Sequence, residues 1–310
     1  MRSIRPGIRR PVCVAVFVLA AFQSAYAQNG VFDWEGETVR ELYPGIQHAE
    51  VRTESPRKLR IECVRIDTAV PGLDFRTTQR AEAWVPEQTE TIRQATRDFL
   101  ASSRTSGLSM AVAVNADAFS PWPAPWNQPT PTNLQGLAIA EGTIVSPPAG
   151  TPSLLVHKDG TLSMAVVDPA ADLSDIDTAV SGFAFCLEEG RPLPSTPEFN
   201  PRTGFGLSED RRWLTLLVVD GRRHASLGCT KEETGDWLRH FGAHTGINMD
   251  GGGSATLAWW DPNDAASEVL NEPVGNGQTW HDKDPTLESG NFRPTERANG
   301  NNLGVCVAKP

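Results

Sequence analysis

One acidic residue followed at once by three glycines and a serine is the feature of this sequence best suited to chemistry. The stretch INMDGGGSATLAWW spans residues 247–260, and Asp250 ends its apolar first part. Glycine adopts backbone conformations closed to other residues and lets a ligand approach the main chain closely. Successive amides in such a turn form a concavity that attracts an anion such as phosphate. The stretch therefore predicts a fixed carboxylate beside an anion-binding turn, made of Gly251, Gly252, Gly253 and Ser254.

Other interpretations of this stretch fit less well. A phosphate-binding P-loop ends in Gly-Lys-Ser/Thr, and no lysine follows these glycines. A nucleophile elbow needs glycine two places on either side of the serine, whereas Ala255 and Thr256 follow Ser254. A flexible glycine turn whose aspartate only caps the backbone remains the simplest alternative.

Short strand-like runs joined by tight turns must position this carboxylate. Residues 58–67 alternate apolar and polar side chains, as in a half-buried strand, and residues 109–119 begin as an apolar run. Turn-forming pairs inside further runs predict three hairpins. These hairpins cover residues 137–146, 153–167 and 204–222.

Two segments show helical patterns. Residues 87–102 carry an apolar stripe that ends at Phe99 and Leu100. Thr230 with Glu233 three residues later forms a capping-box pattern, and Gly242 suits the end of that second helix. The fold class expected is mixed α+β: a single domain with a largely antiparallel central sheet of hairpins and helices packed on it.

The first 27 of the 310 residues resemble a secretory signal peptide. Four arginines precede a short apolar run, and Ala25-Tyr26-Ala27 supplies the small residues of a cleavage site. We expect a mature domain over 28–310, a secreted or periplasmic location and no integral membrane contact. The net charge of −10 argues against nucleic-acid binding, which depends on lysine and arginine.

The remaining cysteines and the acidic residues leave choices open. Two disulfides and four buried thiols are equally compatible with an even number of cysteines in an exported chain. These cysteines are Cys63, Cys186, Cys229 and Cys306. No histidine and acidic cluster with the spacing of a metal centre is present, so we expect no cofactor; the many Asp and Asn residues would allow a structural Ca²⁺ ion.

A longer pattern resembles a known family. Residues 200–257 contain Pro-Arg-Thr with Gly206, then VVDGR, then Gly228 and Thr230 before a helix, then DGGGS. Their order and spacing are similar to the signature of the phosphodiester glycosidase family. The segments VAVNADAF and ERANGNNLGVCV resemble further, looser parts of that signature. The resemblance implies a hydrolase that cleaves a sugar from a glycosyl-1-phosphodiester or a polysaccharide carrying one, for example in envelope or extracellular glycoconjugates such as an exopolysaccharide.

The resemblance also implies roles for individual residues. Such a site must hold a phosphate and stabilise an oxocarbenium-like sugar, and arginine binds phosphate in a bidentate manner. We therefore expect catalytic roles for Asp250, Glu296 and Arg202. Substrate-binding roles are expected for Asn115, Asp117, Thr203, Gly251, Gly252, Gly253, Ser254, Arg297 and Asn301. Tryptophan faces stack on sugar rings, so Trp122, Trp126, Trp259, Trp260 and Trp280 are candidates for a pocket wall.

Two other functions remain open from the sequence. One is a non-catalytic carbohydrate- or phosphate-binding protein of the same fold, which the alanines beside Asn115 keep in consideration. The other is a metal-dependent phosphodiesterase that cuts the phosphorus–oxygen bond. The enzymatic hypothesis requires that the fold bring Asp250, Arg202 and Glu296 into one pocket.

Overall fold

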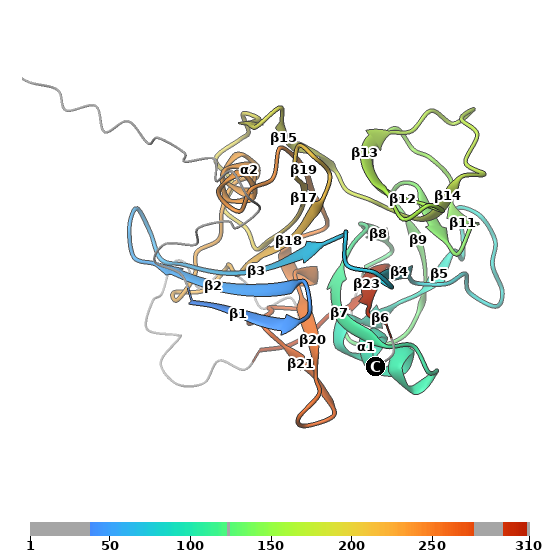
Figure 1. Ribbon diagram of the computed structural model, residues 1–310, viewed down its shortest axis with the longest axis horizontal. Coiled ribbons are helices and arrows are strands. Elements are labelled where there is room, and N and C mark those ends of the chain that lie inside the picture. The colour runs from blue at the N-terminus through green and yellow to red at the C-terminus, as the bar shows by residue number, and fades with distance from the viewer. Residues whose placement is uncertain (1–37, 123–124, 276–293, 309–310) are drawn as a thin grey trace, which may run out of the picture. The chain divides into compact units, whose positions relative to one another are not determined.

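The hairpins expected from the sequence assemble into antiparallel sheets, most of them small. A computed structural model describes residues 38–122, 125–275 and 294–308. Every ladder between two of the described strands is antiparallel. Strands outnumber the two α-helices in this part of the chain, so the mixed α+β prediction with a largely antiparallel architecture is confirmed (Figure 1).

The largest sheet carries the two strands that lead into the candidate site. In spatial order it contains β1 (Thr38–Tyr43), β2 (Ile46–Thr53), β3 (Leu59–Asp67), β18 (Trp213–Val219), β17 (Arg202–Leu207), β19 (Thr245–Asn248), β15 (Ala184–Glu188) and β16 (Arg191–Pro192). The hairpin predicted over 204–222 is β17 with β18, and its strands pair from Arg202 with Val219 to Leu207 with Leu214.

Two five-stranded sheets complete most of the fold. The first contains β11 (Thr143–Ser146), β10 (Ala138–Ala140), β14 (Ile176–Ser181), β12 (Pro152–His157) and β13 (Leu162–Val166). The second contains β21 (Ala266–Val269), β20 (Leu257–Asp261), β7 (Met110–Asn115), β23 (Asn302–Cys306) and β4 (Asp74–Thr77). The other two predicted hairpins are therefore β10 with β11 and β12 with β13.

Very short strands connect these sheets. One pair is β22 (Ala298–Asn299) with β6 (Gln94–Ala95), and a triple is β5 (Thr91–Ile92), β9 (Pro131–Leu134) and β8 (Phe119–Ser120). A single buried apolar cluster contains residues from all three large sheets, for example Val64, Val112 and Val180. Because one core joins the sheets, the strand ends that surround the candidate site are held in a fixed relation to one another.

The second predicted helix is confirmed in detail. Helix α2 (Lys231–His240) has Thr230 as its N-cap, and the full capping box with Glu233 is present. Figure 1 shows α2 beside β15, β17 and β19. Strands β17 and β19 carry Gly204 and Gly246 beneath the helix, where an added Cβ would meet Leu238 within 3.2 Å. The missing side chains let the helix lie close to the sheet.

The first predicted helix is wrong at its beginning. Helix α1 (Thr96–Thr105) starts nine residues later than the apolar stripe suggested and continues past Ser102. The amide of Glu90 donates to the carbonyl of Thr132, and that of Arg93 donates to Thr130. Pairing with this distant segment replaces the first helical turns, a tertiary preference that the local pattern does not contain.

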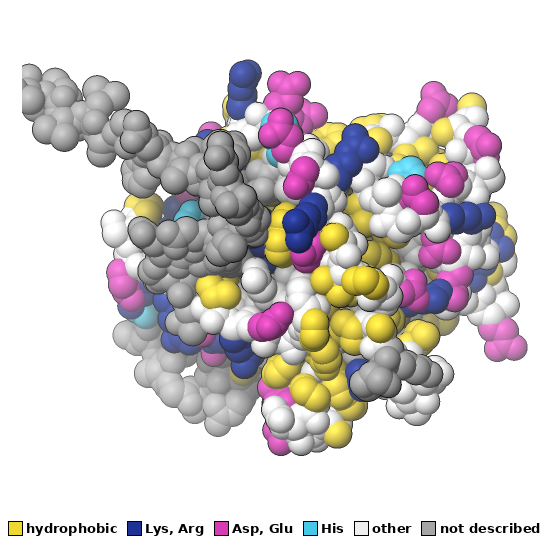
Figure 2. Space-filling view, viewed as in Figure 1, with side chains coloured by type: hydrophobic (Ala, Val, Ile, Leu, Met, Phe, Trp, Pro, Cys, Tyr) yellow, Lys and Arg dark blue, Asp and Glu magenta, His cyan; other side chains and the backbone are white. Residues whose placement is uncertain are grey.

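Some predictions fall on residues that the structure does not describe. The predicted signal peptide over 1–27 and Trp280 lie outside the described residues. Within the described part of the chain, no helix is both long and apolar enough to cross a membrane. On the face shown in Figure 2, acidic and basic side chains are interspersed, so the net negative charge does not form one acidic patch there.

The cysteines that the structure describes are all buried thiols that form no disulfide. Cys63, Cys186 and Cys229 belong to the apolar cluster between the largest sheet and α2, and Cys306 packs near α1. Of the two alternatives that the sequence left open, the structure has the buried thiols.

Candidate functional site

A pocket of about 360 Å³ opens over the glycine turn. It is formed by the segment after β7, the ends of β18 and β19, and the segment before β22. Its lining consists of Ala118, Phe119, Trp122, Gln135, Phe183, Arg222, Asp250, Gly251, Gly252, Gly253 and Arg297. One carboxylate and two guanidinium groups therefore face the same space, beside several aromatic rings.

The position of Asp250 is fixed through its main chain. Asp250 follows β19, and its amide donates to the carbonyl of Ala116 at 3.1 Å. The side-chain amide of Asn115 donates to the carbonyl of Asp250 at 2.7 Å. Asn115 in turn accepts hydrogen bonds from the hydroxyl of Thr203 at 2.7 Å and the amide of Thr256 at 3.0 Å. Asn115 and Thr203, expected to bind substrate, are fully buried and instead join β7, β17 and the glycine turn.

The Asp250 carboxylate lies in a mixed electrostatic environment. Burial raises its pKa to about 6, against lowering effects from a hydrogen bond with the Ser254 hydroxyl, from Arg297, from the Gly251 amide and from Arg222. The Gly251 amide donates to Oδ1 of Asp250 at 3.0 Å. A carboxyl with a pKa near the operating pH exchanges a proton readily, which suits general acid–base chemistry.

The glycines of the turn make room for the two arginines. A Cβ on Gly253 would lie 2.4 Å from Nη2 of Arg297, and a Cβ on Gly252 would lie 3.0 Å from Nη2 of Arg222. Gly252 also has φ +61°, in the left-handed region that favours glycine. The absence of side chains thus lets two guanidinium groups approach the main chain beside Asp250.

Three of the four amides in the turn from Gly251 to Ser254 donate hydrogen bonds within the protein, unlike the expected anion-binding arrangement. Gly251 donates to the Asp250 side chain, Gly252 donates to the carbonyl of Pro201 at 2.8 Å, and Ser254 donates to the carbonyl of Gly251. These three amides hold the turn in shape. The positive groups that face the pocket are therefore the two arginines, rather than a ring of amides.

Arg222 is the site residue that the sequence interpretation missed. Its guanidinium donates to Oδ1 of Asn200 through Nη2 at 2.9 Å and through Nε at 3.2 Å. Its backbone has φ +59°, an uncommon conformation for a residue with a side chain. Burial lowers the pKa of Arg222, and the nearby positive charge of Arg202 acts in the same direction.

Buried Asp220 holds the loop that carries Arg222. Its carboxylate accepts hydrogen bonds from the side-chain amide of Asn271 at 2.9 Å and from the amide of Glu272 at 3.1 Å. Its own carbonyl accepts from the hydroxyl of Ser226 at 2.6 Å. Burial raises the pKa of Asp220 to about 6. These bonds tie both ends of the short loop after β18 to the rest of the fold.

Aromatic side chains form one wall of the pocket. Trp122 stacks on Trp126 with ring centroids 5.6 Å apart, and the guanidinium of Arg297 lies 4.9 Å from the centroid of Trp126. Trp122 and Phe183 are 56% and 45% exposed, so their faces are available to a ligand at the mouth of the pocket. Trp259 and Trp260 do not line this pocket, and they pack with α1 and β1 instead.

The structure does not bring the expected group of Asp250, Arg202 and Glu296 together. Neither Arg202 nor Glu296 lines the pocket. Arg202 donates to the carbonyls of Cys229 at 3.0 Å and Glu198 at 2.8 Å. Glu296 pairs with Arg97 at 2.9 Å, at the beginning of α1. The enzymatic hypothesis in the form that needs these three side chains in one pocket therefore does not hold. A revised form must depend on Asp250 together with the two arginines that do line the pocket, Arg222 and Arg297.

Two further expected site residues form a buried network behind the pocket. Asp117 accepts hydrogen bonds from the Ser181 amide at 2.9 Å and from the side-chain amide of Asn301 at 2.8 Å. Burial raises the pKa of Asp117 to about 8, and the negative charge of Asp250 contributes in the same direction. Asn301 also accepts from the hydroxyl of Thr77 at 2.6 Å. Asp117 and Asn301 therefore connect β4, β14 and β23 and do not face the pocket.

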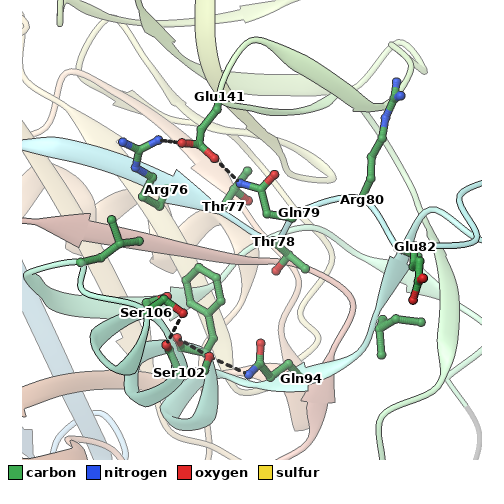
Figure 3. A pocket seen from close by; sticks show the side chains of 15 residues that line it. Arg76, Thr77, Thr78, Gln79, Arg80, Glu82, Gln94, Ser102, Ser106 and Glu141 are labelled. Atoms are coloured by element: carbon green, nitrogen blue, oxygen red, sulfur yellow. Dashed lines mark hydrogen bonds and ion pairs between the residues drawn. The ribbon is translucent and has the colours of Figure 1, made fainter.

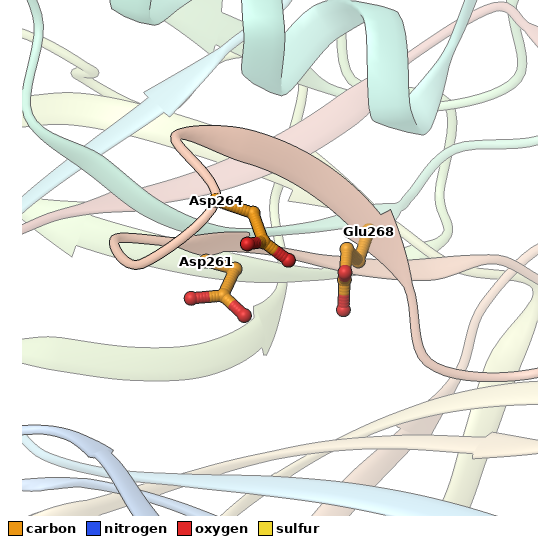
Figure 4. A group of neighbouring side chains, drawn as sticks. All are labelled: Asp261, Asp264 and Glu268. Atoms are coloured by element: carbon orange, nitrogen blue, oxygen red, sulfur yellow. The ribbon is translucent and has the colours of Figure 1, made fainter.

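Among the described residues, one acidic group has the spacing of a metal site. Asp261, Asp264 and Glu268 have carboxylate oxygens within 4.8 Å of one another, at the β20–β21 hairpin (Figure 4). Exposed acidic groups of this kind are common on protein surfaces. None of the three residues lines the Asp250 pocket, so the charged groups available to a ligand there are the two arginines and Asp250 itself.

Comparison with known families decides what kind of protein carries this pocket. The family model described as phosphodiester glycosidase matches residues 109–304, more than half of the chain. This range includes every residue that lines the pocket. The chain belongs to the phosphodiester glycosidase family. No curated protein sequence matches the chain.

Solved structures share the fold of this chain. The catalytic domain of zebrafish N-acetylglucosamine-1-phosphodiester α-N-acetylglucosaminidase, auto-inhibited by its pro-peptide, is 15% identical with a TM-score of 0.60, and 88% of each chain is covered. A hypothetical protein from Synechocystis is 13% identical with a TM-score of 0.54, over 89% of this chain and 64% of that chain. A candidate exported protein from Burkholderia pseudomallei is 12% identical with a TM-score of 0.52, over 81% and 74%. At these identities the similarity establishes a common fold.

The sequence of this family member does contain a signal for Arg222. The VVDGR motif ends at this residue, and the same motif contains Asp220. Besides indicating the family, the motif places a glycine and an arginine directly after a strand. Loops at strand ends commonly carry functional residues, which is a physical reason to expect this arginine at a strand-end pocket.

Proposed function

We propose that this protein hydrolyses glycosyl phosphodiesters in the Asp250 pocket, cleaving the bond between the anomeric carbon and the phosphate oxygen. The observation that carries the proposal is the meeting of one carboxylate and two guanidinium groups over a turn of three glycines. Membership of the family supports the reaction class.

The charges of the pocket match a phosphodiester. Arg222 and Arg297 contribute two positive charges and Asp250 contributes one negative charge, so the pocket has one positive charge in excess. A phosphodiester carries one negative charge, and its leaving group gains a second when the anomeric bond breaks. Fixed guanidinium groups stabilise such developing charge because they need no reorganisation during the reaction.

The leaving group also explains why no carboxylate is needed on the phosphate side. A phosphate monoester has a second pKa of about 6, so it departs as a dianion at neutral pH without a strong acid. Asp250 is then available for the sugar side. It accepts a proton from water, the water oxygen bonds to the anomeric carbon, and the electron pair of the broken carbon–oxygen bond leaves with the phosphate.

The aromatic wall supports a sugar ligand. Trp122 and Phe183 offer exposed faces at the mouth of the pocket, and sugar rings stack on such faces through their apolar C–H groups. The guanidinium of Arg297 lies over the ring of Trp126 and also lines the pocket, so it borders both the aromatic wall and Asp250. We expect the glycosyl group to lie against this wall, with the phosphate against the arginines.

Oxygen-18 water tests the reaction and its bond. The protein is incubated with a panel of glycosyl phosphodiesters, including UDP-N-acetylglucosamine, and the products are examined by mass spectrometry. We expect the label in the released sugar. Label in the phosphate would instead identify a phosphodiesterase, and no turnover of any substrate would favour a binding protein.

Matched variants connect the activity to the pocket. Asp250→Asn and Arg222→Ala are expected to lower kcat/KM by about 100-fold or more, since each removes a group that acts in the transition state. Asp172→Asn and Arg239→Ala serve as controls, because both side chains are outside the pocket and exposed. Equal losses in the controls, or full activity in Asp250→Asn, would reject this assignment.

The setting proposed for this reaction is outside the cytoplasm. The signal-like residues 1–27 and the similarity to a candidate exported protein support export. A polysaccharide or envelope glycoconjugate with glycosyl phosphodiester links is the substrate class that we propose. Recovery of the protein from the periplasm or the culture medium, with residues 1–27 removed, tests this part.

A further inference from the structure

A second cavity, of about 470 Å³, has a lining of a different character. It lies between the chain after β4, helix α1 and the β10–β11 turn (Figure 3). None of its lining residues belongs to the Asp250 pocket. Its size is within the range of about 300–1,000 Å³ that is usual for small-molecule sites.

The charged groups of this cavity compensate one another. Arg76 pairs with Glu141 and with Asp74. The guanidinium of Arg80 lies 3.7 Å from the ring centroid of Trp84 and donates to the carbonyl of Ile144 at 2.6 Å. Arg76, Arg80, Glu82 and Glu141 together contribute no net charge. The cavity therefore lacks the positive excess of the Asp250 pocket, and its chemistry favours an uncharged ligand.

Uncharged polar side chains with fixed orientations make up much of the remaining lining of this cavity. The amide nitrogen of Gln79 donates to Glu141 at 2.7 Å, and that of Gln94 donates to the Ser102 hydroxyl at 3.0 Å. Each bond fixes the plane of its amide and so the direction of the amide oxygen, an acceptor for ligand hydroxyls. The Thr78 hydroxyl accepts from the Asn302 amide at 3.1 Å, so its own proton remains for donation. Figure 3 shows the Gln94 oxygen and the Thr78 hydroxyl directed into the cavity.

Exposed apolar side chains accompany these polar groups. Ile92 is 39% and Leu108 is 36% exposed, and both line the cavity together with Phe99. They are two of the eight large apolar side chains classed as exposed among the described residues. Leaving such side chains in water is unfavourable, and a ligand with an apolar face would cover them.

We infer that this cavity binds a neutral saccharide of one to three sugar units. A sugar ring combines an apolar C–H face with hydroxyl groups around its edge, and the cavity combines Ile92 and Leu108 with the Gln79 and Gln94 amides. This site is separate from the Asp250 pocket and needs no phosphate. It would hold the carbohydrate part of a larger substrate on the surface of the protein.

Saccharide binding to the full chain tests this inference. Neutral trisaccharides of glucose, galactose, mannose and N-acetylglucosamine are screened by saturation-transfer NMR and titrated by calorimetry. We expect at least one of them to bind, and Gln94→Ala and Leu108→Asp to weaken its binding by about tenfold or more, the size of effect expected when a ligand hydrogen bond or an apolar contact is lost. The matched control is Gln88→Ala, an exposed glutamine outside both cavities.

The outcomes separate this site from the proposed hydrolysis. Asp250→Asn should bind the same trisaccharide unchanged, and Gln94→Ala should keep its activity on a small glycosyl phosphodiester. Binding by none of the saccharides would overturn the inference, as would binding that Arg222→Ala abolishes and Gln94→Ala preserves. Tight binding of unstructured peptides in place of saccharides would also overturn it. None of these results depends on whether the Asp250 pocket is catalytic.

Discussion

The guanidinium of Arg297 lies against a residue that has no side chain. A Cβ on Gly253 would approach Nη2 of Arg297 to 2.4 Å and Cζ to 2.7 Å. The φ angle of Gly253 lies outside the left-handed region, so the constraint is a steric one on its neighbour. Glycine at this position therefore determines where the Arg297 guanidinium lies in the pocket. The backbone conformation of Gly253 does not itself require glycine.

This contact predicts the effect of Gly253→Ala. The added methyl group would displace the end of a flexible side chain, so we expect a loss of stability below about 2 kcal/mol. The displaced guanidinium would lower kcat/KM by about tenfold or more, since small misplacements of a binding group are costly. Steady-state kinetics and urea denaturation measure both. The double variant with Arg297→Ala should be no less active than Arg297→Ala alone, and additive losses would contradict this mechanism.

The raised pKa of Asp250 predicts a pH profile. If Asp250 accepts the proton from water, only its carboxylate form is active, and kcat/KM should rise with pH through about 6, the pKa of the free protein. The residual kcat/KM of Asp250→Asn should not show this rise with pH. A rate that falls through the same pH range would mean that Asp250 acts as the acid.

The same raised pKa has a consequence for stability. The folded pKa of about 6 exceeds the ordinary aspartate value of 3.8, so the stabilising contribution of the protonated group is present below about pH 4 and is lost as pH rises through 6. A shift of two pKa units corresponds to a change of at most about 3 kcal/mol in the free energy of unfolding, and contact of Asp250 with water in the pocket reduces this change. We expect Asp250→Asn to be more stable than the natural protein by about 1 kcal/mol at pH 8 and equally stable at pH 4. Urea unfolding at both pH values measures the difference, and an equal gain at both would contradict the linkage.

At the scale of elements, short sequence patterns predicted correctly those helices and hairpins that depend on contacts between residues close in sequence. The capping box of Thr230 and Glu233 lies within four residues, and α2 begins there. The patterns that predicted the three hairpin turns also span only a few residues each, and the strands on either side of these turns pair as expected. The beginning of α1 depends on pairing with residues 130–132, about forty residues away, and was mispredicted.

The N-cap of α2 gives a direct test at this scale. Thr230→Ala removes the acceptor for the Glu233 amide, so the free energy of unfolding should fall by about 1 kcal/mol. Thr230→Ser keeps a hydroxyl and should recover most of the loss. Urea denaturation measures both, with the exposed Thr143→Ala as control. No change in Thr230→Ala would mean that packing alone determines this helix.

At the scale of the whole molecule, the site depends on contacts between segments distant in sequence. The carboxylate follows β19, Arg222 follows β18, and Arg297 lies before β22. The sequence identified Asp250 and Arg297, because a glycine turn and a family pattern marked them. It could not show that the side chains of Arg202 and Glu296 turn toward other partners, since those directions depend on Cys229 and Arg97. Membership of a pocket is a tertiary property, and residue spacing along the chain does not contain it.

The cysteines provide a prediction about the molecule as a whole. Burial raises the pKa of Cys186, Cys229 and Cys306 to about 12, and none of the four described cysteines forms a disulfide. The thiolate is the reactive form, so native protein should react with a thiol reagent far more slowly than unfolded protein. The core of a chain of this size supplies enough burial for stability without disulfides.

A Cys13→Ser background restricts the measurement to these four thiols. We expect none to react with Ellman's reagent in the native protein and four to react after denaturation without reductant. Because there is no disulfide bond to reduce, a reductant should leave the midpoint of denaturant-induced unfolding unchanged. Two missing thiols and a midpoint lowered by reductant would instead reveal a disulfide. Cys186 and Cys229 would be the pair to examine, since Cys229 contributes to the raised pKa of Cys186 and both lie in one apolar cluster.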